Sequence, residues 1–247
     1  MDAIAAFAQH VLGTGHADLP AAAVAATKSF ILDSLGVGVA GSGGPWVREL
    51  VDACGAWGVA DAARVWVRGT ALPAPAAAMC NGYQIHNSEY DCVHEAAVVH
   101  PMAVLLSAAM AYAEQAQGVS GRALLTAIAL GVDVAAGLGI ASKAPLRFFR
   151  PATAGAFAAT AAIGKLRGFD AATLINALSI AYGQLCGTMQ AHAEGSPLLA
   201  MQIGFNARNA IVACDLAATG LVGPQNLLEG PFGYYRLFEG DHDLQRV

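Results

Sequence analysis

Ionisable side chains are concentrated between residues 86 and 101, in the stretch HNSEYDCVHEAAVVHP. On a helix, residues three and four positions apart share a face. This spacing would give two groups: His86, Glu89 and Tyr90 in one, and Asp91, His94 and Glu95 in the other. An imidazole beside a carboxylate is a pairing suited to removing a proton from one atom and returning it to another. The stretch therefore predicts proton-transfer chemistry.

His100 differs from the other histidines because Pro101 follows it. Proline favours the first turn of a helix and moves the residue before it out of the helical conformation. The imidazole is therefore expected at a helix start, where the helix dipole would lower its pKa and favour the neutral form at pH 7. We predict that His100 is the catalytic base, with Glu89 and Asp91 as partner acids and His86 as a residue that orients them.

Two further helices are expected to begin in the same way, at Arg150-Pro151 and at Ser196-Pro197. A helix start presents free backbone N–H groups and the positive end of the dipole, both of which suit an anion. If the three starts converge, they form a pocket for a carboxylate, to which Arg150 would add a positive charge. If they do not, they are ordinary helix starts at separate points of the surface. The sequence leaves both arrangements open.

A metal site and a cysteine nucleophile are the alternatives for residues 86–101. Histidines and carboxylates three or four residues apart can ligate one ion, but the spacing fits no specific metal motif, so no metal and no cofactor are expected. Cys92 lies next to Asp91 and is a candidate nucleophile, although a buried, inert thiol is the simpler interpretation. His94 and Glu95 receive no role.

The elements that must position these residues are helices. Of the 247 residues, 56% are hydrophobic and 13% are charged, which is ample for a buried core. Only RVWVRG (64–69) resembles a strand, so the predicted fold is all-α. Helices are expected over residues 2–13, 20–40, 45–57, 73–88, 101–117, 120–141, 151–167, 170–189, 197–220 and 225–238. Their predicted N-caps include Asp18, Ser120 and Asp170, and their predicted stops include Gly118, Gly168 and Gly220.

Composition argues against several classes of partner. The net charge is −5 and Lys and Arg do not cluster, so nucleic acid is not an expected ligand. Residues 171–193 carry no charged side chain and residues 123–142 only Asp133. The polar residues in the first segment argue against a membrane span, and no signal peptide is expected. Five scattered cysteines predict reduced thiols and a cytoplasmic location. The low charge predicts helix surfaces that are buried in an oligomer.

Four segments resemble the MmgE/PrpD family in order and spacing. They are ILDSLGVGVAGSG (31–43), NGYQIHNSEYDCVHEAAVVHP (81–101), RPATAGAFAATAAIGKLRGFD (150–170) and IGFNARNAIVACDLAATGLVGPQNLLEGPFG (203–233). That family includes 2-methylcitrate dehydratase, cis-aconitate decarboxylase and iminodisuccinate epimerase. The resemblance implies a multi-helix domain, here over residues 1–247, that forms a homodimer through helices. It also implies proton chemistry on small di- or tricarboxylates without a cofactor.

The resemblance also implies roles for single residues. Glu89 and His100 keep the family's acid and base. Arg150 stands where the family has a histidine, and Leu199 lies at or near the family's substrate-binding lysine. An arginine can replace the lysine as a carboxylate binder, but it cannot act as a base. The expected substrate-binding residues are Arg150, His86, Tyr90, Ser196 and Gln202.

Family members usually continue into an α/β lid domain, which would begin soon after Phe232-Gly233. We expect a helical domain without this lid, so that the lid lies on a separate polypeptide or the site is open.

The leading hypothesis is a lyase or isomerase of dehydratase, decarboxylase or epimerase type, which moves a proton next to a carboxylate or carbonyl of a small organic acid. Arg150 and the helix starts would stabilise the enolate-like intermediate. One alternative is a non-catalytic or half-catalytic subunit that binds a separate lid-bearing partner. The other is the same fold acting on a less charged substrate, because Val93, Arg150 and Leu199 replace polar residues of the family. The sequence does not choose among these reactions.

Overall fold

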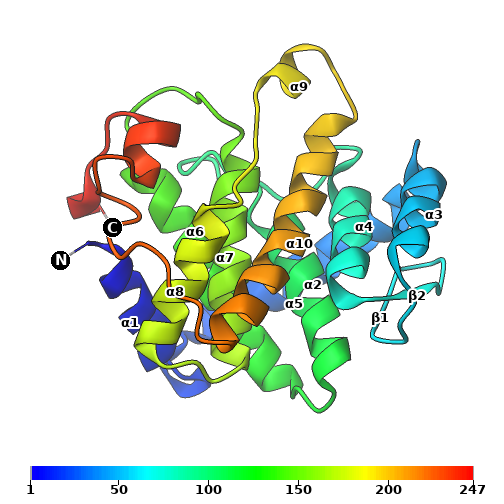
Figure 1. Ribbon diagram of the computed structural model, residues 1–247, viewed down its shortest axis with the longest axis horizontal. Coiled ribbons are helices and arrows are strands. Elements are labelled where there is room, and N and C mark those ends of the chain that lie inside the picture. Colours follow the sequence, from blue (N-terminus) through cyan, green and yellow to red (C-terminus); the bar gives the residue numbers. More distant parts are fainter. Residues whose placement is uncertain (1, 247) are drawn as a thin grey trace.

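The computed structural model describes residues 2–246. In this part of the chain, ten α-helices form one bundle, and one short antiparallel sheet lies at its edge (Figure 1). The helices are α1 (Ile4–Gly13), α2 (Ala21–Gly41), α3 (Val47–Trp57), α4 (Ala74–His86), α5 (Pro101–Ala116), α6 (Gly121–Ala141), α7 (Arg150–Leu166), α8 (Ala171–Tyr182), α9 (Gln190–Ala193) and α10 (Leu198–Ala218). The strands are β1 (Ala63–Arg64) and β2 (Ala71–Leu72). The predicted all-α fold is confirmed.

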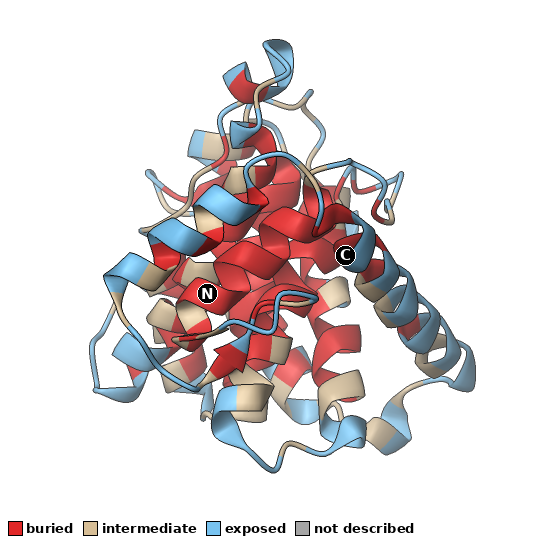
Figure 2. Cartoon of the chain, turned by 90° about the vertical axis from the view of Figure 1, so that its right-hand side faces the viewer, coloured by how far each residue is buried: buried red, intermediate tan, exposed pale blue. Residues whose placement is uncertain are grey.

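Helix α7 is the centre of the core, because every residue from Arg150 to Gly164 is buried. Most of these residues are alanine or glycine, which lets neighbouring helices come close. At Gly155, an added Cβ would lie only 2.7 Å from a methyl group of Val104 on α5. Figure 2 shows the buried residues gathered along the central helices, with exposed residues on the outer elements. The alanine-rich sequence thus produces a tightly packed bundle.

Most predicted helix boundaries agree with the structure. The side chains of Ser120 and Asp170 accept hydrogen bonds from the main-chain N–H groups of Ala123 and Thr173, as N-caps do. The three predicted stops, Gly118, Gly168 and Gly220, all have positive φ angles just beyond a helix end. The prediction that Asp18 caps α2 is wrong. Its carboxylate accepts from the N–H of Gly15, and α2 begins after Pro20.

Three expected elements are shorter than predicted. The helix expected over 170–189 ends at Tyr182, because the chain from Cys186 to Thr188 is held in an extended form by side chains of α10. Of the helix expected over 225–238, only a π-helical turn at Tyr235–Glu239 is present. The RVWVRG segment contributes only Arg64 to a strand, and the rest of it turns back toward β2.

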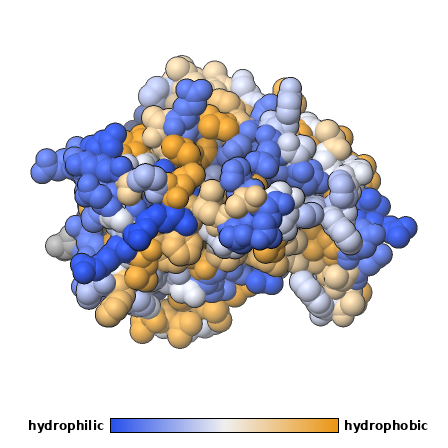
Figure 3. Space-filling model, turned by 90° about the horizontal axis from the view of Figure 1, so that it is seen from above, coloured by the Kyte–Doolittle hydropathy of each residue, from blue (hydrophilic) through white to orange (hydrophobic). Residues whose placement is uncertain are grey.

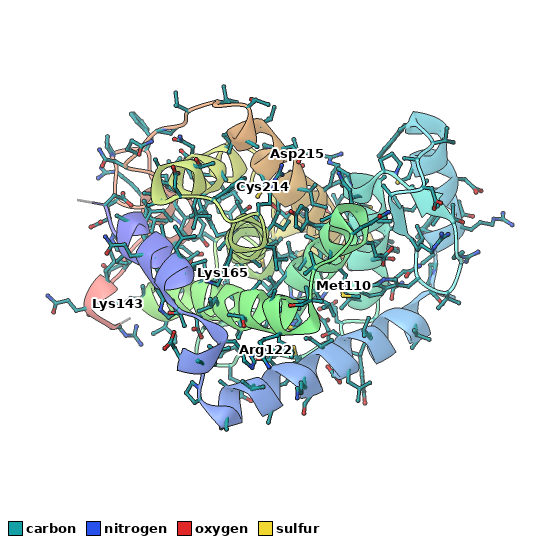
Figure 4. All side chains as sticks on the ribbon, turned by 90° about the horizontal axis from the view of Figure 1, so that it is seen from below. Met110, Arg122, Lys143, Lys165, Cys214 and Asp215 are labelled. Atoms are coloured by element: carbon teal, nitrogen blue, oxygen red, sulfur yellow. The ribbon has the colours of Figure 1, made fainter. Side chains whose placement is uncertain are left out.

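Two helices, α2 and α6, are long and apolar enough to cross a membrane by length and composition alone. In α6, 67% of the apolar window is buried inside the protein, as in a core helix. In α2 only 22% is buried, and Phe30, Leu32 and Val39 are exposed. Figure 4 shows this helix, in blue, lying along one side of the molecule. The exposed face of α2 therefore carries several large apolar side chains that no other part of the described chain covers.

Candidate active site

The carboxylate of Asp91 lies between two imidazoles. Its Oδ1 atom is 2.8 Å from Nδ1 of His86, and its Oδ2 atom is 3.3 Å from Nδ1 of His100. The same Nδ1 atom of His100 donates a hydrogen bond to the main-chain oxygen of Asp91 at 3.1 Å. The side chains of His86 and Asp91 are fully buried, whereas that of His100 is 18% exposed. Only His100 of the three therefore reaches toward solvent.

Three helix ends bring these groups together. Helix α4 ends at His86, and α5 begins after His100, whose ring meets that of His86 edge-on with centroids 4.9 Å apart. The N-cap of α7, Phe149, packs against the other side of His86 at 5.5 Å. Ser196, just before α10, lines the same pocket as His86. The three predicted helix starts thus converge on His86.

Burial and hydrogen bonding set the protonation of this cluster. Burial alone would raise the pKa of Asp91, but the contacts with His100 and His86 outweigh it and bring the pKa to about 2. For His100, burial favours the neutral ring, but the hydrogen bonds and charge of Asp91 prevail and raise its pKa above the usual value. The expectation that the helix start would lower the pKa of His100 is therefore wrong, because a carboxylate in contact outweighs a helix dipole.

Residues 87–99 form a loop and not the continued helix that the predicted faces required. The loop reverses at Glu89 and Val98, which have φ angles of +50° and +52°. His94 and Val99 exchange main-chain hydrogen bonds, and Nδ1 of His94 accepts from the N–H of Ala97. His94, which had no predicted role, therefore holds the shape of the loop.

Arg150 does not face an open pocket. Its guanidinium is buried and donates to Glu239 through Nε and Nη2, at 2.9 and 2.7 Å. Nη1 donates to the main-chain oxygen of Ala97 at 2.8 Å, and Nη2 also donates to the hydroxyl of Ser142. The predicted role of Arg150 as an anion-binding residue does not agree with this arrangement, because the guanidinium is buried and makes four hydrogen bonds inside the protein. The sequence did not indicate Glu239 as a partner.

A pocket of about 190 Å³ opens beside His86. Predicted site residues His86, Glu89 and Ser196 line it, and Leu199 forms part of its wall. Its other lining residues are Pro45, Tyr83, Asn87, His192, Gly195, Pro197 and Ala200. Figure 3, a view of the molecule from above, shows hydrophilic and hydrophobic residues mixed over this surface. The pocket therefore offers both a carboxylate and an apolar wall to a ligand.

Tyr83 and His192 are two of the several lining residues that were not predicted. Tyr83 lies three residues before His86 on α4, so helical spacing from a known site residue would have found it. His192 is exposed on α9, which stands above the start of α10 in Figure 1. No spacing in the sequence indicates that His192 and His86 line one pocket.

Tyr90 and Gln202 lie outside this pocket. Tyr90 is 85% exposed and lines a shallow hollow beside α2, together with Leu32 and Asp33. Gln202 is buried, and its amide binds both the N–H and the carbonyl of Thr188. Their expected contact with substrate therefore has no support from the positions of their side chains.

The alternative chemistries can be compared with this geometry. His86, Asp91 and His100 place ligand atoms within 4.8 Å of one another, close enough for one divalent cation. The same distances also fit an arrangement without a metal, in which the N–H groups at Nδ1 of His86 and of His100 both face the carboxylate of Asp91. Burial raises the pKa of Cys92 to about 11, so its sulfur is a protonated thiol and not a nucleophilic thiolate at neutral pH.

The chain is similar to a known protein family and to several curated enzymes. The family described as MmgE/PrpD N-terminal domain matches residues 5–247. Cis-aconitate decarboxylase from Aspergillus terreus is 31% identical over 224 residues, which is 87% of this chain and 46% of that protein. The cis-aconitate decarboxylases of Mus musculus and Homo sapiens are each 30% identical, over 84% and 93% of this chain and 44% and 48% of theirs. The chain spans about half the length of the curated relatives that it matches.

Proposed function

Because this chain belongs to the MmgE/PrpD family, we propose that His100 moves a proton on a small organic acid in a lyase or isomerase reaction. Its relatives point to chemistry of the dehydratase or decarboxylase type. The observation that carries the proposal is the contact of Asp91 with both His86 and His100. It supports a fixed, charge-stabilised imidazole of His100, whose ring packs against His86, a residue of the pocket lining.

The hydrogen bond to Asp91 determines which nitrogen of His100 reacts. A carbonyl oxygen only accepts hydrogen bonds, so Nδ1 of His100 carries the proton that it donates to the main chain of Asp91. The lone pair of the neutral ring is then on Nε2, the atom available to a substrate. When Nε2 takes a proton, the carboxylate of Asp91 stabilises the imidazolium that forms. His86 holds the same carboxylate from its other oxygen.

The raised pKa of His100 suits either direction of transfer. The carboxylate of Asp91 favours the protonated ring, which can donate to a carbanion-like carbon, and the neutral ring can accept a proton. In a decarboxylation, the C–C bond to the departing carboxylate breaks, its electron pair stays on the substrate carbon, and the proton of Nε2 adds there. In a dehydration, His100 removes a proton and the substrate's hydroxyl leaves as water. Glu89 lines the adjacent pocket and is the candidate partner acid for that step.

A second candidate is a substrate with fewer negative charges than cis-aconitate. It is favoured by the pocket itself, where the carboxylate of Glu89 faces ligands, Leu199 forms part of the wall and the guanidinium of Arg150 is paired with Glu239. A ligand with a carbonyl or a single carboxylate would meet less repulsion there than a tricarboxylate.

Assembly is part of the proposal. The exposed apolar face of α2 supports a homodimer, since such faces mark contact sites between proteins. The chain spans about half the length of its relatives. In this proposal a lid on a separate polypeptide closes the site, or the site is open. A non-catalytic subunit that binds such a partner is the alternative. The free cysteines support a cytoplasmic location.

The direct test is turnover in D₂O with cis-aconitate and related mono-, di- and tricarboxylates, followed by NMR. For a decarboxylation we expect deuterium to enter the product at one carbon, whereas the product of a dehydration would carry none from this step. His100→Gln should abolish both turnover and deuterium uptake while the far-ultraviolet circular dichroism stays unchanged. Full activity of a folded His100→Gln protein would show that His100 does not carry the reaction.

A further inference from the structure

We propose that the buried ion pair of Arg150 and Glu239 is a positioning device for His100. Arg150 holds the loop that carries the histidine, and Glu239 holds Arg150. The role of the device rests on the proposed function of His100, whereas the position of the loop can be measured without any substrate.

Arg150 is linked directly to the loop that precedes His100. Nη1 of Arg150 donates to the main-chain oxygen of Ala97, three residues before His100, at 2.8 Å. Ala97 is fully buried, and Gly139 of α6 lies directly against it. A Cβ at Gly139 would be only 2.7 Å from that of Ala97. Ala97 is therefore fixed between α6 and α7.

This loop needs an anchor. Val98, directly after Ala97, has a φ angle of +52°, a conformation that is costly for a β-branched residue. Glu89 at the other end of the loop is also left-handed. Such conformations persist only when surrounding contacts hold them. The hydrogen bond from Arg150 acts beside the more strained of the two residues.

Arg150 is itself held in place. One carboxylate oxygen of Glu239 accepts from Nε and Nη2 of Arg150 and from the hydroxyl of Ser142. The other accepts from the hydroxyl of Tyr234 at 2.7 Å. Arg150 and Glu239 are 3% and 2% exposed, so water does not compete with these bonds. One oxygen of the carboxylate therefore orients the guanidinium, and the other is fixed by Tyr234.

The start of α7 thus contacts the site twice. Phe149 packs against His86, and Arg150 binds the loop before His100. A shift of Arg150 would move both imidazoles relative to Asp91. The device therefore acts on geometry and not by touching substrate.

The experiment is an NMR titration of the histidine Hε1 and Cε1 signals, with His100 assigned by its loss in His100→Gln. Arg150→Lys keeps the charge, but an ammonium cannot bind Glu239 and Ala97 in the same planar geometry. We expect the pKa of His100 in this variant to fall toward the ordinary imidazole value of about 6.5. Glu239→Gln should shift it in the same direction by a smaller amount.

The matched control is Arg167→Lys. Arg167 follows the opposite end of α7 and pairs with Asp215 at 2.6 Å, on the side of the molecule shown in Figure 4. The titration of His100 in the Arg167→Lys variant should coincide with that in the wild type. If folded Arg150→Lys and Glu239→Gln also coincide with the wild type, the inference is overturned. If the titration shifts but turnover is unchanged, positioning stands and the proposed function of His100 fails.

Native-state hydrogen exchange of the unmodified protein covers the case in which neither variant folds. The N–H groups of His94 and Val99 bind each other's carbonyls across the loop. We expect them to open together with the N–H groups of α7, as one cooperative unit. Exchange of the loop amides in a separate, less stable unit would overturn the inference.

Discussion

Arg150 and Glu239, 89 positions apart in the sequence, form a buried ion pair in which one carboxylate oxygen accepts from both Nε and Nη2 of the arginine. The contact joins the start of α7 to the turn at Tyr235–Glu239. It uses the residue that the sequence offered as a substrate-binding cation. Arg150 therefore has a structural role in the fold and is not free to bind a substrate.

Breaking this pair should destabilise the protein strongly. Glu239→Ala leaves a buried guanidinium without its counter-charge, which typically costs about 3–5 kcal/mol. Replacing both members, as Arg150→Met with Glu239→Leu, should cost less than Glu239→Ala alone, because no unpaired charge remains. Urea unfolding of the single and double variants measures this. A double variant that is less stable than either single one would contradict it.

Asp91→Asn should reduce turnover by about 10²–10⁴-fold with little change in KM. An amide keeps the size of the carboxylate but cannot stabilise the imidazolium of His100 by charge. The measurement is kcat and KM on the substrate identified in the D₂O assay, with far-ultraviolet circular dichroism as the folding control. A rate equal to that of the wild type would assign Asp91 to packing alone.

Stability should fall in acid because of Asp91. Its pKa is about 2 in the folded protein against an ordinary 3.8, so the folded state binds this proton less readily than the unfolded state. The resulting stabilisation, about 2 kcal/mol, is complete above the unfolded pKa and is lost as pH falls through the folded one. Urea unfolding from pH 5 to pH 2 should show the loss, and Asp91→Asn should show a smaller one. Equal slopes for both proteins would rule out this origin.

Leu199→Lys should improve the binding of a tricarboxylate. The side chain lies in the pocket wall, where an ammonium would offset the carboxylate of Glu89. We expect the affinity for cis-aconitate to rise about tenfold or more, which is about 1.4 kcal/mol, while that for its trimethyl ester stays unchanged. Isothermal titration calorimetry compares these ligands. Leu198→Lys is the control, because Leu198 is adjacent to Leu199 and more exposed but does not line the pocket. Tight binding of the trianion by the unmodified protein would exclude the less charged substrate.

Leu32→Glu should weaken the proposed homodimer. Leu32 is 73% exposed on the apolar face of α2, and a buried carboxylate at an interface is unfavourable. Sedimentation equilibrium should show a dimer for the wild type and an at least tenfold larger Kd for the variant. Val59→Glu changes an even more exposed apolar residue away from α2 and should leave the mass unchanged. If both variants match the wild type, α2 is not the dimer interface.

The sequence predicted the helices well because their boundaries depend on local chemistry. Ser120 and Asp170 cap the helices that follow them, and proline marks the start of α5 at Pro101. The helix expected over 170–189 failed because its last part is held by Gln202 and Asn206, which lie on another helix. Local patterns do not report such distant contacts.

The site was predicted in part for the same reason. His86, Asp91 and His100 lie within one short segment, so the sequence indicated that they work together, although helical spacing placed His86 and Asp91 in separate groups. The protonation of His100 was not, because the carboxylate in contact with it outweighs the dipole that its position before Pro101 suggested. The partner of Arg150 was also hidden, since nothing near Arg150 in the sequence points to Glu239.

The pairing of a local cluster with a distant anchor has a consequence for how the protein is made. During synthesis, the segment from His86 to His100 leaves the ribosome long before Glu239 is added. The loop can then only sample its strained shape at Val98, because the arginine that binds Ala97 still lacks its counter-charge. The site would thus mature as one of the later events of folding, after the helices that frame it have already formed.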